Sequence, residues 1–167
     1  MTINDINGEH TVIDLQKNPE TQKYLFNDTP SEKDIKALNQ WLLRHRDDYV
    51  RLYHGTSSRI PVKEKGLLKT SRRTKKSLQS QTGYVYLSVF PGMARTFGEI
   101  AYPHDDVTVY AVDIKIRELL ADKDQLANKR MWAGVDCGDT LADSLIYGHG
   151  ARVKRNINPW EIKETSF

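Results

Sequence analysis

Three short segments of this chain hold residue types that could bind or transform a substrate. They are Leu52–Thr56 (LYHGT), Gly83–Gly98 (GYVYLSVFPGMARTFG) and Ala142–Tyr147 (ADSLIY). Between them they supply an imidazole, several aromatic rings and a carboxylate. These groups can exchange hydrogen bonds, stack on a flat ring and stabilise positive charge.

Motifs for other common chemistries are absent from the sequence. The histidines, at positions 10, 45, 54, 104 and 149, show no metal-binding spacing such as HExxH. Cys137 is the only cysteine, which excludes intrachain disulfides and multi-cysteine zinc or iron–sulfur sites. No GxSxG, Walker or GxGxxG pattern occurs. We therefore expect no metal site.

Taken together, the three segments resemble the ADP-ribosyltransferase superfamily, in its diphtheria-toxin-like or poly(ADP-ribose)-polymerase-like branch. That branch carries a His-Tyr-Glu signature on three strands, and Tyr53-His54-Gly55-Thr56 matches the first of them. Tyr86-Leu87 matches the second, with Phe97 on the helix that follows. Asp143 matches the third, with Asp in place of Glu. The resemblance covers roughly residues 50–163.

The resemblance implies a function for each matching residue. Gly55 would present its backbone to the carboxamide of nicotinamide, and Tyr86 and Phe97 would hold the cationic ring between them. His54 would bind a hydroxyl of the adenosine ribose. Asp143 would bind the 2′-hydroxyl of the nicotinamide ribose and stabilise the oxocarbenium-like transition state. Further NAD-binding candidates are Thr56, Ser88, Arg72 and Arg73.

Structural alternatives exist for each of these residues. A backbone hydrogen bond at a strand end would explain His54, and core packing would explain the two aromatic residues. A turn or a helix cap would explain Asp143, and Asp136 and Asp139 are rival acids nearby. We rank Asp143 first because an apolar pattern typical of a strand begins directly after it.

Two departures from the family pattern bear on the reaction. Asp143 is one methylene shorter than the usual Glu, and Ala94 stands where polymerase-like members often have a serine. Both changes favour a single transfer over polymer elongation. The sequence thus predicts a mono-ADP-ribosyltransferase that consumes NAD without a metal and modifies a protein or a nucleic acid.

Two alternative functions remain. The first is an NAD-dependent enzyme similar to tRNA 2′-phosphotransferases, suggested by LYHGT, Gly66-Leu67, the Arg72-Arg73 pair and YLS. The basic-histidine segment typical of that family is absent. The second is a non-catalytic module that binds nucleic acid or NAD. Base stacking would require aromatic residues among the cations, and residues 54–81 contain none.

Positive charge is concentrated near the middle of the chain. The formal net charge is +3, yet residues 51–81 hold nine Lys or Arg residues against one acid, Glu64. Such a block attracts phosphates of a dinucleotide or of a nucleic acid. The segment Arg72–Lys76 favours an acidic or nucleic-acid acceptor. The alternatives are a segment that only neutralises the NAD pyrophosphate and a solvated loop.

Periodicity and end signals predict an α+β domain with split, bent mixed sheets of the ADP-ribosyltransferase type. Helices or helical turns are expected over residues 11–16, 21–26, 32–46, 61–65, 91–100 and 117–128. Strands are expected over residues 49–53, 83–88, 107–114, 144–147, 151–153 and 160–162. Residues 69–82 and 129–142 are expected to form loops.

The 167 residues suit a single globular unit, with 38% apolar residues and 8 Tyr, 4 Phe and 3 Trp to build its core. We divide it into an N-terminal helical region, residues 1–49, and a catalytic domain, residues 50–167. No apolar run is long enough to span a membrane, and the first ten residues lack a secretory signal pattern. We expect a cytoplasmic protein, or a toxin-like effector delivered into the cytoplasm of a target cell.

Overall fold

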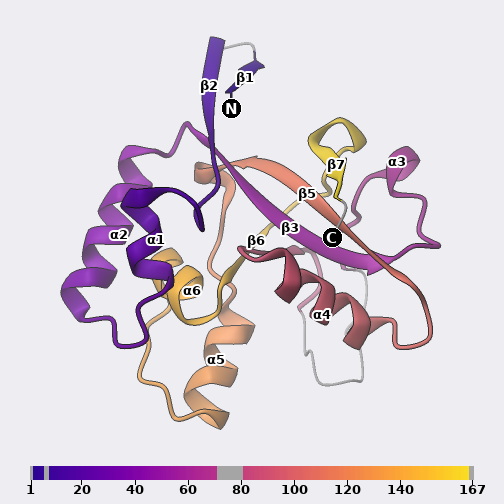
Figure 1. Ribbon diagram of the computed structural model, residues 1–167. Helices are drawn as coiled ribbons and strands as arrows, with labels where there is room; N and C mark the ends of the chain where they lie inside the picture. Colours follow the sequence, from indigo (N-terminus) through magenta and orange to yellow (C-terminus); the bar gives the residue numbers. More distant parts are fainter. Residues whose placement is uncertain (1, 6–7, 71–80, 166–167) are drawn as a thin grey trace.

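Two long strands, β3 (Tyr49–Ser57) and β5 (Val107–Lys115), cross the middle of the molecule (Figure 1). They pair antiparallel along their full length in this computed structural model, which describes residues 2–5, 8–70 and 81–165. Residues 109–114 are all buried, as expected for a central strand covered on both faces. The predicted central strand is therefore confirmed.

Shorter strands extend this pair into a mixed sheet. β2 (Gly8–Ile13) runs parallel to the start of β3, and β1 (Thr2–Asp5) pairs antiparallel with β2. β7 (Ile162–Glu164) pairs with β5. β4 (Val85–Ser88) pairs along its whole length with β6 (Gly150–Val153). All these pairs are antiparallel except β2–β3, and the α+β class is confirmed.

Three helices gather on one side of the sheet (left in Figure 1): α1 (Pro19–Leu25), α2 (Glu32–Arg44) and α6 (Leu141–Tyr147). The predicted helix at residues 32–46 is confirmed as α2, whose start is closed by a capping box between Ser31 and Asp34. Asn39 of α2 reaches the start of α6, where its side chain accepts a hydrogen bond from the Ala142 backbone N–H at 3.0 Å. This contact fixes the two helices relative to each other.

The remaining helices lie in different parts of the molecule (Figure 1). α3 (Val62–Lys65) ends at Gly66, whose positive φ of 76° suits a glycine. α4 (Pro91–Ala101) and α5 (Lys123–Trp132) are longer, and α4 packs against β3 whereas α5 packs against α6. The 3₁₀ turn η1 (Ile116–Glu118) leads from β5 toward α5, and η2 (Pro159–Glu161) joins β6 to β7. The short helix expected at residues 61–65 and the helix expected at 91–100 are confirmed.

The close approach of α4 to β3 depends on glycine. A Cβ atom on Gly55 would lie 2.1 Å from the backbone oxygen of Ala94, and one on Gly98 would lie 2.9 Å from the backbone of Gly55. The absence of side chains therefore lets helix and strand backbones touch. The contact between β3 and α4 therefore explains why position 55 requires a glycine, independently of any ligand.

The strand predicted at residues 144–147 is wrong, because this segment is helix α6. Thr140 and Asp143 form a capping box at its start, with the Thr140 hydroxyl accepting from the Asp143 backbone N–H. Ala142, Leu145 and Ile146 are buried at helical spacing. Short apolar runs fit either periodicity, and here the cap signal decides for the helix.

Three other boundaries differ from expectation. Residues 11–16 do not form a helical turn, because Val12 and Ile13 belong to β2 and pair with β3. The helix predicted at 117–128 begins at Lys123, because Leu120 is held in an antiparallel bridge to Arg152. The same helix continues to Trp132, into the segment predicted as a loop. Residues 160–161, predicted as part of a strand, belong to η2.

Residues 1–49 contain strands as well as helices. Ile13, Leu15, Leu38 and Trp41 share a single hydrophobic core with residues from β3, β5, α6 and β6. Within the described part of the chain, no helix is both long and apolar enough to cross a bilayer.

Candidate active site

A cavity of about 580 Å³ opens beside the end of β3. It is lined by β3, β4, α4, the start of α5 and the connection between α3 and β4. Its volume falls within the range of small-molecule sites, roughly 300–1,000 Å³. The walls are mostly apolar and aromatic, with a few polar groups, as in typical ligand pockets.

The cavity exists because β3 and β4 separate. Their only paired residues are Tyr53 and Ser88, whereas β3 continues to Ser57 against β5. Beyond Tyr53, the other edge of β3 has no strand partner among the described residues. β3 thus extends past the predicted end at Tyr53, and His54, Gly55 and Thr56 line the opening.

His54 reaches across this gap to β4. Its Nδ1 lies 2.6 Å from the backbone oxygen of Tyr86. Because a carbonyl oxygen only accepts, Nδ1 carries the hydrogen and donates it. Burial lowers the pKa of His54, and this hydrogen bond opposes the shift only in part. The imidazole is therefore neutral at pH 7, with Nε2 free to act as an acceptor.

Two aromatic side chains face the cavity from different elements. Tyr86 lines it from β4 and Phe97 from α4, and both are half-buried. Thr56 and Ser88 also line it and are buried. The structure thus brings together His54, Gly55, Thr56, Tyr86, Ser88 and Phe97, all of which the sequence singled out.

The acid that meets these residues is Asp124, at the start of α5. The hydroxyl of Tyr86 donates to Asp124 Oδ2 at 2.7 Å, and the Gln81 backbone N–H donates to the same oxygen at 3.1 Å. Burial, followed by this hydrogen bond to Asp124, raises the pKa of Tyr86. The phenol therefore keeps its proton and acts as a donor to the carboxylate.

Arg152 on β6 completes this cluster. Its guanidinium carbon lies 4.0 Å from the centre of the Tyr84 ring, and its Nη1 donates to Asp124 Oδ2 at 3.3 Å. Nη1 is also 3.4 Å from the Tyr86 hydroxyl, and the residue is only 4% exposed. A buried cation thus offsets the charge of Asp124 beneath the cavity wall.

Pairing across the sheet places Asp124 beside Tyr86. Tyr86 pairs with Arg152, and Arg152 exchanges two backbone hydrogen bonds with Leu120, at 2.8 and 2.9 Å. α5 begins three residues after Leu120, with Asp122 as its N-cap. The start of this helix therefore follows directly from the bridge at Leu120.

A second carboxylate, Asp122, lines the same cavity. It accepts a hydrogen bond from the Gln125 backbone N–H at 3.1 Å, and its own N–H donates to the Ser144 hydroxyl. That hydroxyl donates in turn to the Gly150 backbone oxygen at 2.6 Å. Burial raises the pKa of Asp122. Two carboxyl groups therefore stand at the same cavity.

Asp143 does not reach this cavity, which corrects the prediction from sequence. Its carboxylate accepts from the backbone N–H groups of Gly138 and Thr140, both at 3.1 Å, and from the Thr140 hydroxyl. It is 4% exposed and completes the capping box of α6 with the N-cap residue Thr140, the structural alternative considered above. Asp136 and Asp139 are exposed and also lie outside the cavity lining.

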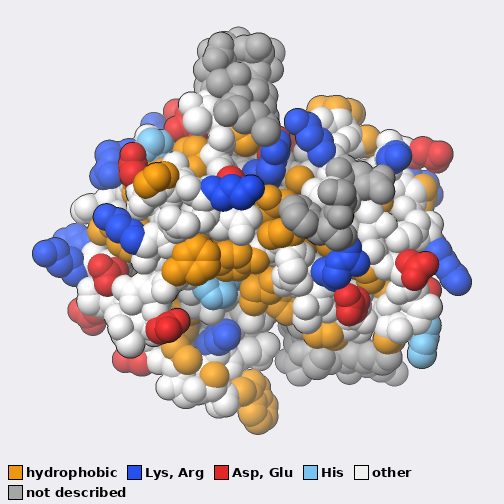
Figure 2. Space-filling model, in the orientation of Figure 1, with side chains coloured by type: hydrophobic (Ala, Val, Ile, Leu, Met, Phe, Trp, Pro, Cys, Tyr) orange, Lys and Arg blue, Asp and Glu red, His pale blue; other side chains and the backbone are white. Residues whose placement is uncertain are grey.

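The basic block divides into members with different surroundings. Arg51 forms a buried pair with Asp113 at 2.8 Å, while Lys65 and Lys69 are exposed and line the cavity. Arg72 and Arg73 lie outside the described residues. On the face shown in Figure 2, Lys and Arg side chains are scattered and interspersed with Asp and Glu.

Sequence reasoning missed Asp122, Asp124 and Arg152. One signal was available: Asp122 and Gln125 have the spacing of a helix cap directly after three apolar residues, 119–121. Nothing local marks Arg152 as part of a site, because only the pairing of β4 with β6 brings it to Tyr86.

No group of His, Cys, Asp and Glu residues that could hold a metal ion occurs among residues 2–5, 8–70 and 81–165.

Comparisons with protein-family models, curated proteins and solved structures find no match to this chain.

Proposed function

We propose that this protein is an NAD-dependent mono-ADP-ribosyltransferase with an ADP-ribosyltransferase-like fold. One observation carries the proposal: His54, Tyr86 and a carboxylate, from three separate parts of the chain, line or border one cavity. The carboxylate is Asp124, with Asp122 beside it, in place of Asp143. The split between β3 and β4, from which the cavity opens, also agrees with the bent, divided sheet expected for such a fold.

In the proposed reaction, the bond between the nicotinamide nitrogen and C1′ of the ribose breaks, and its electron pair leaves with neutral nicotinamide. Tyr86 and Phe97 hold the ring by stacking on either side. Asp124 stabilises the positive charge that develops at C1′, as carboxylates do in glycosidases. A nucleophilic oxygen or nitrogen of the acceptor then bonds to C1′ and releases its proton to water.

The hydrogen bonds around these residues support the assigned functions. All donors to Asp124 from the described residues reach Oδ2, which leaves Oδ1 for the 2′-hydroxyl of the ribose. The neutral His54 has Nε2 available to accept from a second ribose hydroxyl. Lys65 and Lys69, at the exposed part of the lining, suit the diphosphate of NAD.

The test is release of nicotinamide from NAD, followed by chromatography, for the wild type and three Asp→Asn variants. Asp124→Asn should lower the rate by about 10²–10³-fold, the usual loss when a preorganised electrostatic group is removed. Asp136→Asn changes an exposed acid outside the cavity and should have no effect. Asp143→Asn keeps a capping side chain and should also retain activity.

Two results would contradict the proposal. The first is a wild-type protein that releases no nicotinamide. The second is an Asp124→Asn variant as active as Asp136→Asn, which would remove the carboxylate from the reaction. Loss of activity in Asp143→Asn with an unchanged circular dichroism spectrum would reinstate Asp143.

A further inference from the structure

The C-terminal end of α5 exposes two large apolar side chains in succession. Met131 is 72% exposed and Trp132 is 80% exposed. Single exposed apolar residues are common on protein surfaces and need no explanation by themselves. What distinguishes Trp132 is its position relative to the cavity.

Trp132 lies on the face of α5 that lines the cavity. Asp124, Gln125 and Asn128 are lining residues, and Trp132 follows Asn128 by four positions and Gln125 by seven. Side chains at these spacings share one face of a helix. With a rise of about 1.5 Å per residue, Trp132 lies roughly 12 Å beyond Asp124 along the helix axis. Trp132 therefore lies beyond the cavity lining, on the same face of α5 as the lining residues.

The surroundings of this face favour an anionic ligand with flat rings. Lys65 and Lys69 are exposed at the cavity lining, and the charge of Asp124 is offset by Arg152. An exposed indole offers a stacking surface, and stacking on aromatic side chains is how proteins hold unpaired bases while cations meet the phosphates. A nucleotide strand would satisfy both features, with its phosphates at the cations and a base on the indole.

We propose that Trp132 is a stacking platform for an unpaired base of a single-stranded nucleic acid, and that this strand is the acceptor that approaches the cavity. The acceptor part rests on the proposed function. The binding part does not, because stacking on Trp132 requires no NAD.

The experiment measures binding of fluorescently labelled single strands of about 12 nucleotides, a length within the usual site sizes. Fluorescence anisotropy is recorded without NAD for one DNA strand, one RNA strand of the same sequence and the corresponding DNA duplex. Trp132→Ala should weaken binding by between about 5-fold and about 150-fold, the range of base stacking on one aromatic side chain. Trp132→Tyr should keep most of the affinity, because it retains an aromatic face.

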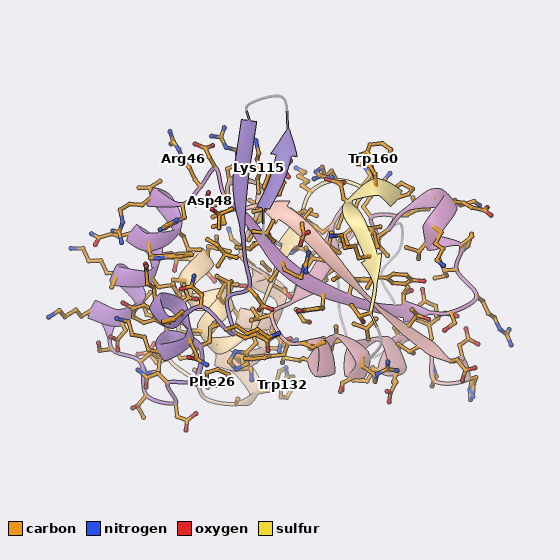
Figure 3. All side chains as sticks on the ribbon, turned by 45° about the horizontal axis from the view of Figure 1, so that its top comes forward. Phe26, Arg46, Asp48, Lys115, Trp132 and Trp160 are labelled. Carbon is orange, nitrogen blue, oxygen red and sulfur yellow. The ribbon has the colours of Figure 1, made fainter. Side chains whose placement is uncertain are left out.

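Trp160 provides a matched control. It is 81% exposed, on η2, and Figure 3 shows it at the opposite edge of the molecule from Trp132. Trp160→Ala should leave affinity unchanged. Tighter binding of DNA or of RNA would identify the preferred sugar, and either result supports the platform.

Three outcomes would overturn the inference: no binding of either strand by the wild type, equal effects of Trp132→Ala and Trp160→Ala, or equal affinity for a duplex and a single strand. The proposed function fails separately, by the absence of nicotinamide release. A protein that binds strands through Trp132 without cleaving NAD would keep the platform and lose the transferase.

Discussion

Replacing Arg152 by methionine would remove the only buried cation that the structure places against Asp124 among the described residues. The guanidinium carbon is 4.0 Å from the centre of the Tyr84 ring, and the side chain is 5% exposed. Methionine fills a similar apolar volume but supplies neither charge nor donors. Arg152→Met therefore tests the electrostatic part of the cluster more than its packing.

The expected loss of stability follows from the contacts. Breaking a buried ion pair by removing one partner costs about 3–5 kcal/mol. The hydrogen bonds of Nη1 are long, at 3.3–3.4 Å, and Asp124 keeps 19% of its side chain exposed, so we place the loss near the lower end, at about 3 kcal/mol. Loss of the cation also leaves the carboxylate of Asp124 without its positively charged partner.

Urea denaturation of the wild type and of Arg152→Met would measure the loss of stability. Arg59→Met is the matched control, because Arg59 also pairs with an aspartate, Asp105 at 3.7 Å, but is 83% exposed. Its loss should stay below about 1 kcal/mol. If both variants lose the same stability, the reasoning about the buried pair is wrong.

Three further predictions concern the same region. Gly55→Ala should destabilise the fold by about 1–3 kcal/mol in urea, because the new Cβ would lie 2.1 Å from the Ala94 oxygen, whereas Gly92→Ala, with open space around it, should not. Because the pKa of His54 is lowered in the fold, the unfolded chain binds a proton at this residue at higher pH than the folded protein does. The stability should therefore fall as the pH drops below about 6.5. His54→Gln should reduce that dependence in thermal melts from pH 5 to pH 8. The raised pKa of Asp122 gives a pH dependence of the opposite sign, because stability is lost as the pH rises through the raised value. Asp122→Asn keeps a capping side chain and should melt at a temperature no lower than that of the wild type at pH 7. A lower melting temperature would show that the charge of Asp122 is needed by the fold.

Local patterns in the sequence were sufficient for many of the elements. The Ser31–Asp34 capping box, the apolar spacing of α2 and the uninterrupted apolar run of β5 each express their structure within a few residues. Local patterns also predicted the site residues His54, Tyr86 and Phe97, because these residues lie on or next to β3, β4 and α4, which the sequence itself indicates.

Which carboxylate lies at the cavity depends on long-range contacts that no local sequence pattern contains. ADSLIY by itself fits a strand or a helix, and the Thr140–Asp143 cap signal favours the helix. The contact of Asn39 with the start of α6 exists only once α2 has packed there. Asp124 reaches Tyr86 because β4 pairs with β6 and β6 bridges to Leu120, three segments far apart in sequence. Residue types and spacing alone thus determined which chemistry the chain could support. Long-range strand pairing decided which carboxylate stands at the cavity, because backbone hydrogen bonds between distant segments set the register that side-chain patterns leave open.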